Sequence, residues 1–271
     1  MADIYEVIVG SLNFRSAPDG PILATLRRAS RVEVVGPSQP DSNDARATWL
    51  HVRPLPQGAP NGFVSDRYVT LVDAPGPPAT GNSSGLGVSE TQLLTLSPTG
   101  KAWILKALVD KFADVVEPYG ILQNRRRLCH FLAQSAHESA GFRTLEEFGG
   151  ATYWGRYEGR ADLGNTQAGD GVLYHGRGIF QLTGRANYRS MGTKIGVDLE
   201  GDPRLAAEGD ISLLTACEFW KSRRLERFAD QNDIKEITRR INGGSNGLAD
   251  RTAFFRRAWT IWGDPNQPPE V

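Results

Sequence analysis

Two glutamates, Glu138 and Glu147, stand nine residues apart on either side of a glycine. Apolar residues recur at helical spacing from Leu128, so we expect a helix that ends near Glu138, with Gly141 in the following position that favours positive φ. The negative end of this helix would favour the protonated form of Glu138, as a general acid requires. On one continuous helix the carboxylates would lie about 13 Å apart along the axis. A turn at Gly141 would instead allow the separation of about 6.5 to 9.5 Å that admits a water beside a glycosidic bond and leads to inversion.

A second segment, residues 174–188, is rich in glycine and aromatic side chains. In an extended conformation Gln181 and Thr183 would point to one side, and Phe180 and Leu182 to the other. Its glycines would also allow the backbone to approach a ligand closely. The pattern fits the wall of a cleft, and it also fits an ordinary β-hairpin. The glutamate pair is equally ambiguous when taken alone, because such pairs are common on solvated surfaces.

The elements that must position these residues have a helical period from Ser89 onwards. Helices are predicted at residues 90–96, 103–116, 125–139, 212–223, 234–241 and 250–262. The stretch 149–188 is not helical throughout, so we expect a mainly α domain with one inserted β or loop region. Cys129 and Cys217 fall in two of the predicted helices and are expected to be buried, reduced thiols.

The first part of the chain has a different period. Residues 5–72 contain short alternating runs separated by turn residues, which predicts a small antiparallel all-β barrel. Residues 73–88 hold proline, glycine and serine with almost no apolar side chain, which predicts a flexible linker. The sequence therefore predicts a multidomain chain, with a β domain at 1–72, a linker at 73–88 and a helical domain at 89–271.

Charge excludes some partners and leaves others open. Lys plus Arg and Asp plus Glu are balanced at 31 each, so no overall charge attracts nucleic acid or an anionic membrane. Arginines gather in the second half, at positions 125, 126, 127, 223, 224, 227, 239, 240, 256 and 257. They form either a basic face towards an acidic polymer or solvated helix faces.

No segment has the composition of a membrane span or of an export signal. We therefore expect a protein that is made in the cytosol without a signal peptide and does not insert into a membrane. The balanced charge leads us to expect no nucleic-acid partner. We also expect a monomer.

The N-terminal strands resemble the bacterial SH3-like family. The resemblance rests on Leu12-Asn13-Phe14-Arg15-Ser16-Ala17-Pro18, on Trp49-Leu50-His51-Val52 and on Gly62-Phe63-Val64. It implies an SH3-like barrel that binds bacterial cell walls, although the aromatic residues could equally fill the core of a purely structural barrel.

Three blocks of the second half resemble glycoside hydrolase family 19, which contains chitinases and related lysozymes. The blocks are Ala133-Gln134-Ser135-Ala136-His137-Glu138-Ser139, the segment from Gly176-Arg177-Gly178 to Tyr188, and Ile241-Asn242-Gly243-Gly244 with Asp250-Arg251. They occur in the order of the family and span most of residues 90–262. The resemblance implies a lysozyme-like (α+β) fold and the hydrolysis of an amino-sugar polymer.

The same resemblance implies a role for each matching residue. Glu138 matches the general acid, and Glu147 matches the base of the lysozyme-like branch. Thr183 and Asn187 match residues that position the attacking water and the N-acetyl group of the substrate. The matching cleft residues that hold sugar or support the two carboxylates are Gln181, Tyr188, Asn242 and Arg251. Chitinases of the family carry their base further along the chain, so Glu158, 20 residues after Glu138, is a rival base.

We therefore expect an endolysin-type peptidoglycan hydrolase that cleaves β-1,4 bonds between amino sugars of the bacterial cell wall, after release or secretion, with inversion. A chitinase shares this chemistry and is the nearest alternative, and a catalytically silent wall-binding protein is an alternative from another class. His130, His137 and His175 could suggest zinc, but they form no His-Glu-x-x-His motif, so we expect neither a metal nor a cofactor.

Overall fold

The structure, a computed structural model, describes residues 3–7, 11–27, 30–42, 47–55, 60–72 and 86–267. The chain forms two compact units, of which the first comprises Met1–Pro78 with Ala186–Leu205 and the second Ala79–Arg185 with Ala206–Val271. Residues 73–85, most of the predicted linker, lie outside the described residues. The predicted boundaries at residues 72 and 89 therefore stay predictions. Within the described ranges, no helix has both the length and the apolar character that crossing a membrane requires.

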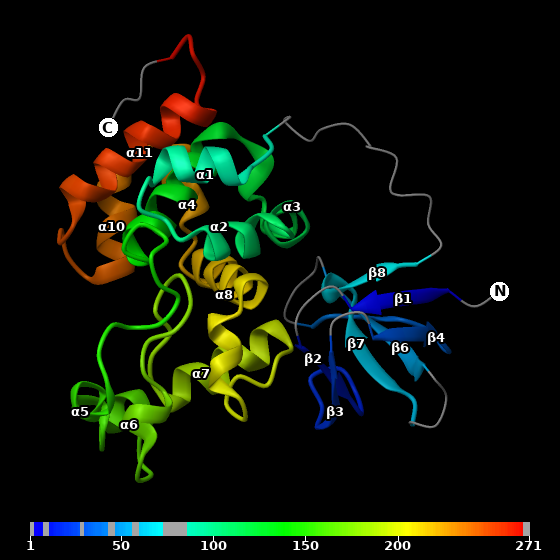
Figure 1. Cartoon of the computed structure of the whole chain (residues 1–271). Helices are drawn as coiled ribbons and strands as arrows, with labels where there is room; N and C mark the ends of the chain where they lie inside the picture. The colour runs from blue at the N-terminus through cyan, green and yellow to red at the C-terminus, as the bar shows by residue number, and fades with distance from the viewer. Residues whose placement is uncertain are drawn as a thin grey trace. The chain divides into compact units, whose positions relative to one another are not determined.

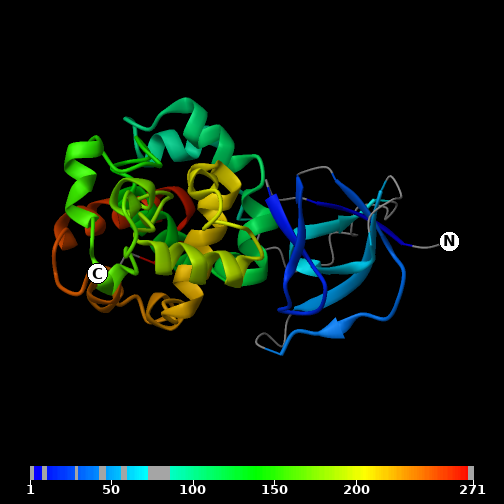
Figure 2. The same cartoon turned by 90° about the horizontal axis from the view of Figure 1, so that it is seen from below.

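The first unit contains an antiparallel sheet that curls on itself (Figures 1 and 2). Its strands are β1 (Ile4–Val7), β2 (Ser11–Arg15), β3 (Ile22–Arg27), β4 (Arg31–Val34), β5 (Gln39–Pro40), β6 (Thr48–Leu55), β7 (Gly62–Ser65) and β8 (Val69–Leu71). They lie in the order β3-β2-β7-β6-β4-β1-β8, with β5 paired to β6. Gly62 is required where β7 meets β2, because a Cβ there would lie 2.5 Å from the carbonyl oxygen of Arg15.

The predicted fold class, a separate SH3-like barrel followed by a lysozyme-like domain, is wrong. The strands form one curled N-terminal sheet with β3 and β8 at its edges, and no separate barrel is evident in the described residues. The compact unit that holds the sheet also takes in Ala186–Leu205 from the second half of the sequence. Alternation of apolar residues predicts strands but not closure, which depends on pairing between the first and last strands of the path.

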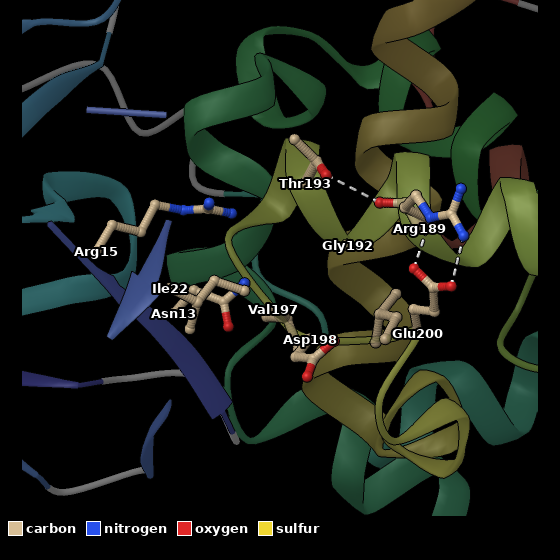
Figure 3. A pocket seen from close by; sticks show the side chains of 10 residues that line it. Asn13, Arg15, Ile22, Arg189, Gly192, Thr193, Val197, Asp198 and Glu200 are labelled. Atoms are coloured by element: carbon tan, nitrogen blue, oxygen red, sulfur yellow. Dashed lines mark hydrogen bonds and ion pairs between the residues drawn. The ribbon is translucent and has the colours of Figure 1, made fainter. Parts of the chain in front are cut away.

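A pocket of about 130 Å³ lies within this first unit (Figure 3). It is lined by Asn13, Arg15, Ile22, Arg189, Gly192, Thr193, Val197, Asp198, Leu199 and Glu200. The guanidinium of Arg189 donates two hydrogen bonds to Glu200, at 2.6 and 2.7 Å. None of the residues that the sequence predicts for chemistry lines this pocket.

The second unit is mainly α, as predicted. Its helices are α1 (Glu90–Leu96), α2 (Ala102–Val109), α3 (Phe112–Val116), α4 (Arg125–Glu138), α5 (Ala151–Trp154), α6 (Asp170–Leu173), α8 (Gly209–Ser222), α9 (Glu226–Asp230), α10 (Ile234–Asn242) and α11 (Leu248–Trp262), whereas α7 (Arg185–Ile195) continues into the first unit. The long helices α4 and α11 pack along each other. Figure 1 shows α5 and α6 at the opposite end of this unit from α1.

Local signals explain where several of these helices begin. Ser89 and Gln92 form a reciprocal capping box at the start of α1. The side chain of Asn124 accepts a hydrogen bond from the backbone N–H of Arg127 at 2.9 Å and caps α4. The predicted helix 103–116 is in fact two helices, α2 and α3, separated at Asp110 and Lys111. Cys129 and Cys217 are buried and free, as expected.

Candidate active site

The chain reverses direction directly after Glu138, the last residue of α4. Three consecutive residues have positive φ, namely Ala140 (53°), Gly141 (76°) and Phe142 (55°). The buried hydroxyl of Ser139 donates to the carbonyl of Ser135 at 2.7 Å and accepts from the N–H of Phe142 at 3.0 Å, which stabilises the turn. Helix α4 therefore does not continue towards Glu147, as the glycine predicted. The left-handed conformation begins one residue earlier than predicted, at Ala140.

Glu138 is held by the helix pair α4 and α11. Its Oε1 accepts a hydrogen bond from the guanidinium of Arg251, and a second nitrogen of that guanidinium donates to Gln134, one turn earlier on α4. Arg251 and Gln134 are buried, whereas the Glu138 side chain keeps 20% of its surface exposed. Arg251 therefore fixes one oxygen of the carboxyl group by a charge-assisted hydrogen bond, and part of the side chain stays exposed.

A second contact joins the same two helix ends. The Nδ1 atom of His137 lies 2.6 Å from a carboxylate oxygen of Asp250. Adjacent residues of α4 thus bind adjacent residues of α11. The two contacts fix the end of α4 relative to the start of α11 and restrict the position of Glu138.

Glu147 has surroundings of another kind, built from loops and short helices. Its Oε1 accepts from the guanidinium of Arg156 and, at 2.8 Å, from the hydroxyl of Tyr157, both in the 3-10 helix Gly155–Tyr157. Its Oε2 accepts from the backbone N–H of Gly176 at 3.3 Å. The side chain is 17% exposed. Since a carboxylate offers about four acceptor positions, three donors leave one position for a water.

The segment 174–188 does not form an extended wall, and its centre is the hairpin that the sequence left open as the alternative. Arg177 and Leu182 exchange two backbone hydrogen bonds, at 3.1 and 2.7 Å, and residues 178–181 form the turn. Gln181 has φ of 50°, and Ile179 is buried. Glycine is required at position 178, because φ is 79° and a Cβ would lie 2.8 Å from the carbonyl oxygen of Ala206. In so tight a turn, successive side chains no longer point to opposite faces as they would in an extended strand.

The hairpin nevertheless brings one predicted site residue, Gln181, to Glu147. A Cβ at Gly176 would lie 2.9 Å from Oε1 of Gln181 and 3.2 Å from Cβ of Glu147, so both side chains flank this glycine. The amide of Gln181 donates to the carbonyl of Gly178 at 2.8 Å, and the hydroxyl of Thr183 donates to the carbonyl of Gln181 at 2.9 Å. Glu147 and Gln181 therefore lie on either side of Gly176, and Thr183 is bonded to the backbone of Gln181.

The other predicted site residues lie on helix ends. Asn242 is the last residue of α10, where its side chain donates to the carbonyl of Asn246 at 2.6 Å and accepts from the N–H of Gly244 at 2.8 Å. Asn187 and Tyr188 lie in the first turn of α7, within the other compact unit. Asn187 is exposed and Tyr188 is buried.

Glu158, the rival base, binds a neighbouring loop. Its two carboxylate oxygens accept from the backbone N–H groups of Gly169 and Gly171, at 2.6 and 2.8 Å. A Cβ at Gly171 would lie 2.6 Å from the backbone nitrogen of Glu158, so the loop is packed against this residue. Both oxygens are used to hold the start of α6, whereas Glu147 faces Gly176 and Gln181.

Sequence analysis missed several residues that support Glu147. Next to it, the carboxylate of Glu146 binds the imidazole of His175 at 2.9 Å and the guanidinium of Arg177 at 3.0 Å. His175 also stacks on Trp154, with ring centroids 3.7 Å apart and an interplanar angle of 1°. This cluster joins the hairpin to the segment that carries Glu146 and Glu147. The spacing of Glu146, His175 and Arg177 gave no local signal, because the contact spans about thirty residues of sequence.

The histidines do not form a metal centre in the described part of the chain. No group of three His, Cys, Asp or Glu side chains there could hold an ion. His130 is buried, is hydrogen-bonded to Asn232 at 2.8 Å and is stacked on Phe255. His137 and His175 bind carboxylates, as described above. All three histidines thus have structural contacts.

Comparison with known proteins identifies the fold and the family. The family model described as chitinase class I of glycoside hydrolase family 19 matches residues 107–236. A glycosyl hydrolase family 19 domain-containing protein of Haemophilus influenzae is 31% identical over 180 residues, which are 56% of this chain and 88% of that protein. Acidic endochitinase Q of Nicotiana tabacum is 31% identical over 161 residues, and the match spans 49% of this chain and 60% of the tobacco protein.

A solved structure agrees with these matches. Chitinase C of Streptomyces griseus superposes with a TM-score of 0.52 at 24% identity, over 69% of this chain and 98% of that one. At this identity the likeness concerns the fold, which is α+β and lysozyme-like. The Haemophilus relative shares nearly its whole length with this chain. The chain therefore belongs to glycoside hydrolase family 19 and is an enzyme that hydrolyses glycosidic bonds.

Proposed function

We propose that this enzyme hydrolyses the β-1,4 bonds between the amino sugars of bacterial peptidoglycan with inversion at the anomeric carbon. The observation that carries the proposal is the pair of partly exposed carboxyl groups, Glu138 and Glu147, on either side of the reversal after α4. Each is oriented by donors that leave part of the group accessible. A buried structural pair would not leave both groups open to solvent.

Glu138 acts as the general acid. It protonates the glycosidic oxygen, and the departing sugar then leaves as an alcohol. Arg251 holds one carboxyl oxygen, so the proton resides on the oxygen that faces the substrate. After the bond breaks, the guanidinium stabilises the carboxylate that remains.

Glu147 acts as the general base. It removes a proton from a water that attacks the anomeric carbon from the opposite side, which gives inversion. Tyr157 and Arg156 fix one carboxylate oxygen, and Gly176 donates to the other. Gln181 flanks the same glycine, and with Thr183, which donates to the carbonyl of Gln181, it positions that water. The roles of Asn187, Tyr188 and Asn242 stay predictions of the family resemblance.

Peptidoglycan as the substrate rests on the resemblance of the Glu147 position to the lysozyme-like branch of the family, since the Haemophilus relative is named by its family alone. Peptidoglycan is the amino-sugar polymer of bacterial cell walls, and the enzyme would act on it after release from the cell or secretion. Chitin remains the second candidate, because the tobacco relative and the Streptomyces structure are named chitinases.

Digestion of purified peptidoglycan sacculi tests the proposal. We expect new reducing ends, identified by reduction and mass spectrometry as one of the two amino sugars, and the inverted anomer of the first product by NMR. The Glu138→Gln variant is the control and should release none. Cleavage of chitin oligosaccharides without any new reducing end from sacculi would assign the enzyme to chitin instead.

A further inference from the structure

An aromatic and arginine stack continues from the hairpin that carries Gln181. Phe180, the residue before Gln181, stacks on Phe219 of α8 with ring centroids 4.9 Å apart and planes 9° apart. One turn further along α8, the guanidinium of Arg223 lies over the other side of this stack, 3.8 Å from the Phe219 ring centroid. The position of Arg223 is thus fixed relative to the hairpin.

The same guanidinium reaches the helix that ends at Asn242. Its Nε donates to the carbonyl oxygen of Arg240 at 3.2 Å, two residues before Asn242. Arg223 therefore bridges the two segments that carry Gln181 and Asn242, both predicted to hold sugar. Arg223 is thus joined to the hairpin through Phe219 and to the end of α10 through Arg240.

Two further arginines follow in the same corner of the unit. Arg224, with φ of 52°, and Arg227 are both exposed. The guanidinium groups of Arg227 and Arg240 lie 4.5 and 4.6 Å from the ring centroid of Phe228. We name Arg223, Arg224 and Arg227 the arginine corner. Stacking on an aromatic ring restricts a guanidinium and prepares it to bind a planar anion.

Basic residues outnumber acidic ones around the arginine corner. Residues 219–240 contain seven Lys or Arg and four Asp or Glu, in a chain that is neutral overall. Asp230 is bound to Arg127, and Glu236 to Arg239 and Arg240. In the part of the chain that the structure describes, no ion pair involves an arginine of the corner. Burial lowers the pKa of Arg223.

The two candidate polymers differ in charge. Chitin is uncharged, whereas peptidoglycan bears short peptides with free carboxylates at every second sugar. A guanidinium binds a carboxylate through two parallel hydrogen bonds. We propose, on the basis of the proposed function, that the arginine corner binds the carboxylates of the peptide stems on a glycan strand in the cleft and gives the enzyme its preference for peptidoglycan over chitin.

The test compares sacculi with and without their carboxylate charge, and adds an uncharged amino-sugar polymer as a reference. Wild type and the triple variant Arg223→Gln, Arg224→Gln, Arg227→Gln are assayed on intact sacculi, on sacculi with amidated carboxylates and on uncharged glycol chitin. We expect the ratio of kcat/KM on intact sacculi to that on glycol chitin to fall about tenfold in the variant, through KM. Amidation should lower this ratio for wild type by a similar factor and should not lower it further for the variant.

A matched control lies on α11. Arg256 and Arg257 are exposed, and Arg257 is stacked over Phe254 at 4.4 Å, so the pair resembles the arginine corner in chemistry. Arg256→Gln with Arg257→Gln should leave the ratio unchanged. Equal losses on charged and uncharged substrates, or no loss on sacculi, would overturn the proposal. So would a preference that disappears only when phosphate-bearing wall polymers are removed from the sacculi.

Failure of the proposed function would be seen separately. If the wild-type enzyme releases no reducing ends from sacculi, peptidoglycan hydrolysis is wrong whatever the arginines do. Co-sedimentation of the Glu138→Gln protein with sacculi, with and without the triple substitution, then tests binding alone. Equal sedimentation of the two proteins would overturn the arginine proposal.

Discussion

The two carboxyl groups of the candidate site are held by different kinds of structure. Glu138 ends a 14-residue helix, and its partner Arg251 lies on the 15-residue helix packed along it. Glu147 lies in a loop, and its partners come from a 3-10 helix of three residues and from a hairpin. The acid is thus fixed by the core, whereas the base depends on short segments that hold one another.

This difference explains why the contacts around Glu147 are more numerous. A long helix restrains a side chain through its packing, so one guanidinium suffices to orient Glu138. A loop lacks that restraint, and each part of the loop needs its own contact, as with Glu146, His175 and Glu158. We infer that substitutions near Glu147 affect both geometry and stability, while those at Glu138 affect chemistry first.

Removal of the acid should have the largest effect. In Glu138→Gln the amide oxygen can still accept from Arg251, but no proton is available for the leaving group, so we expect kcat to fall by about 10³-fold. The rate per folded molecule on sacculi and on glycol chitin checks this, with circular dichroism to confirm folding. Retention of a tenth of the wild-type kcat would remove Glu138 from the mechanism.

Removal of the base should come next and should separate Glu147 from Glu158. We expect Glu147→Gln to lower kcat by about 10²-fold, because the attacking water loses its proton acceptor. Glu158→Gln replaces an oxygen that accepts from a backbone N–H with an amide group, so we expect less than about a fivefold change in kcat and a stability loss of about 1 to 2 kcal/mol.

Rates and unfolding midpoints are measured on both variants in parallel. A fall in kcat at Glu158 that exceeds the fall at Glu147 would make Glu158 the base. In that case the bonds from Glu158 to Gly169 and Gly171 would have to break during turnover.

The position of Glu138 at the end of a helix could be predicted from the sequence, because the residues that signal a helix end lie next to it in the chain. Helical spacing up to Glu138 and the glycine after it gave the end of α4 within one residue. The partner of Glu138 was named only through the family resemblance, since Arg251 lies 113 residues away. Periodicity predicts which residues lie on a helix, but not which helices meet.

The loops and the hairpin around Glu147 were predicted less well. Alternation suggested an extended wall at residues 174–188, but Gly178 and the positive φ of Gln181 close a hairpin there. Tyr157 and Arg156 directly precede the rival base Glu158 in the sequence, yet their side chains bind Glu147. The curled sheet was mistaken for a barrel for a similar reason, since strand pairing between distant residues leaves no trace in a local pattern.

Alanine substitutions at two glycines test how tightly the hairpin next to Glu147 is packed. Gly178 and Gly243 share φ of 79°, but a Cβ at Gly178 would meet the Ala206 carbonyl at 2.8 Å, and a Cβ at Gly243 would meet nothing within 4 Å. We expect Gly243→Ala to cost about 1 kcal/mol for the left-handed backbone. Gly178→Ala should cost about 2 to 3 kcal/mol, because the clash with backbone is added. Equal unfolding free energies in denaturant titrations would mean that the hairpin moves freely.

Helix α4, which ends at Glu138, also carries the titratable group His130. Its effect, on the free energy of unfolding, should be the smallest of the predicted effects. Burial of His130 in α4 lowers its pKa to about 4, in spite of the hydrogen bond to Asn232, whereas an unfolded chain has the usual value of about 6.5. Between these values the unfolded state binds more protons, so stability falls as pH falls from about 6.5 towards 4. We expect wild type to lose about 1 kcal/mol between pH 7 and pH 5.5 through this group.

The control is His130→Gln, which cannot titrate and keeps a polar end for Asn232. Denaturant unfolding of both proteins at pH 7 and pH 5.5 isolates the histidine, because all other groups titrate in both. The difference in unfolding free energy between the two proteins should shift by about 1 kcal/mol in favour of the variant at the lower pH. A constant difference would mean that His130 takes up its proton in the folded state, and that the core around α4 admits water. The acid would then be held less rigidly than its two long helices suggest.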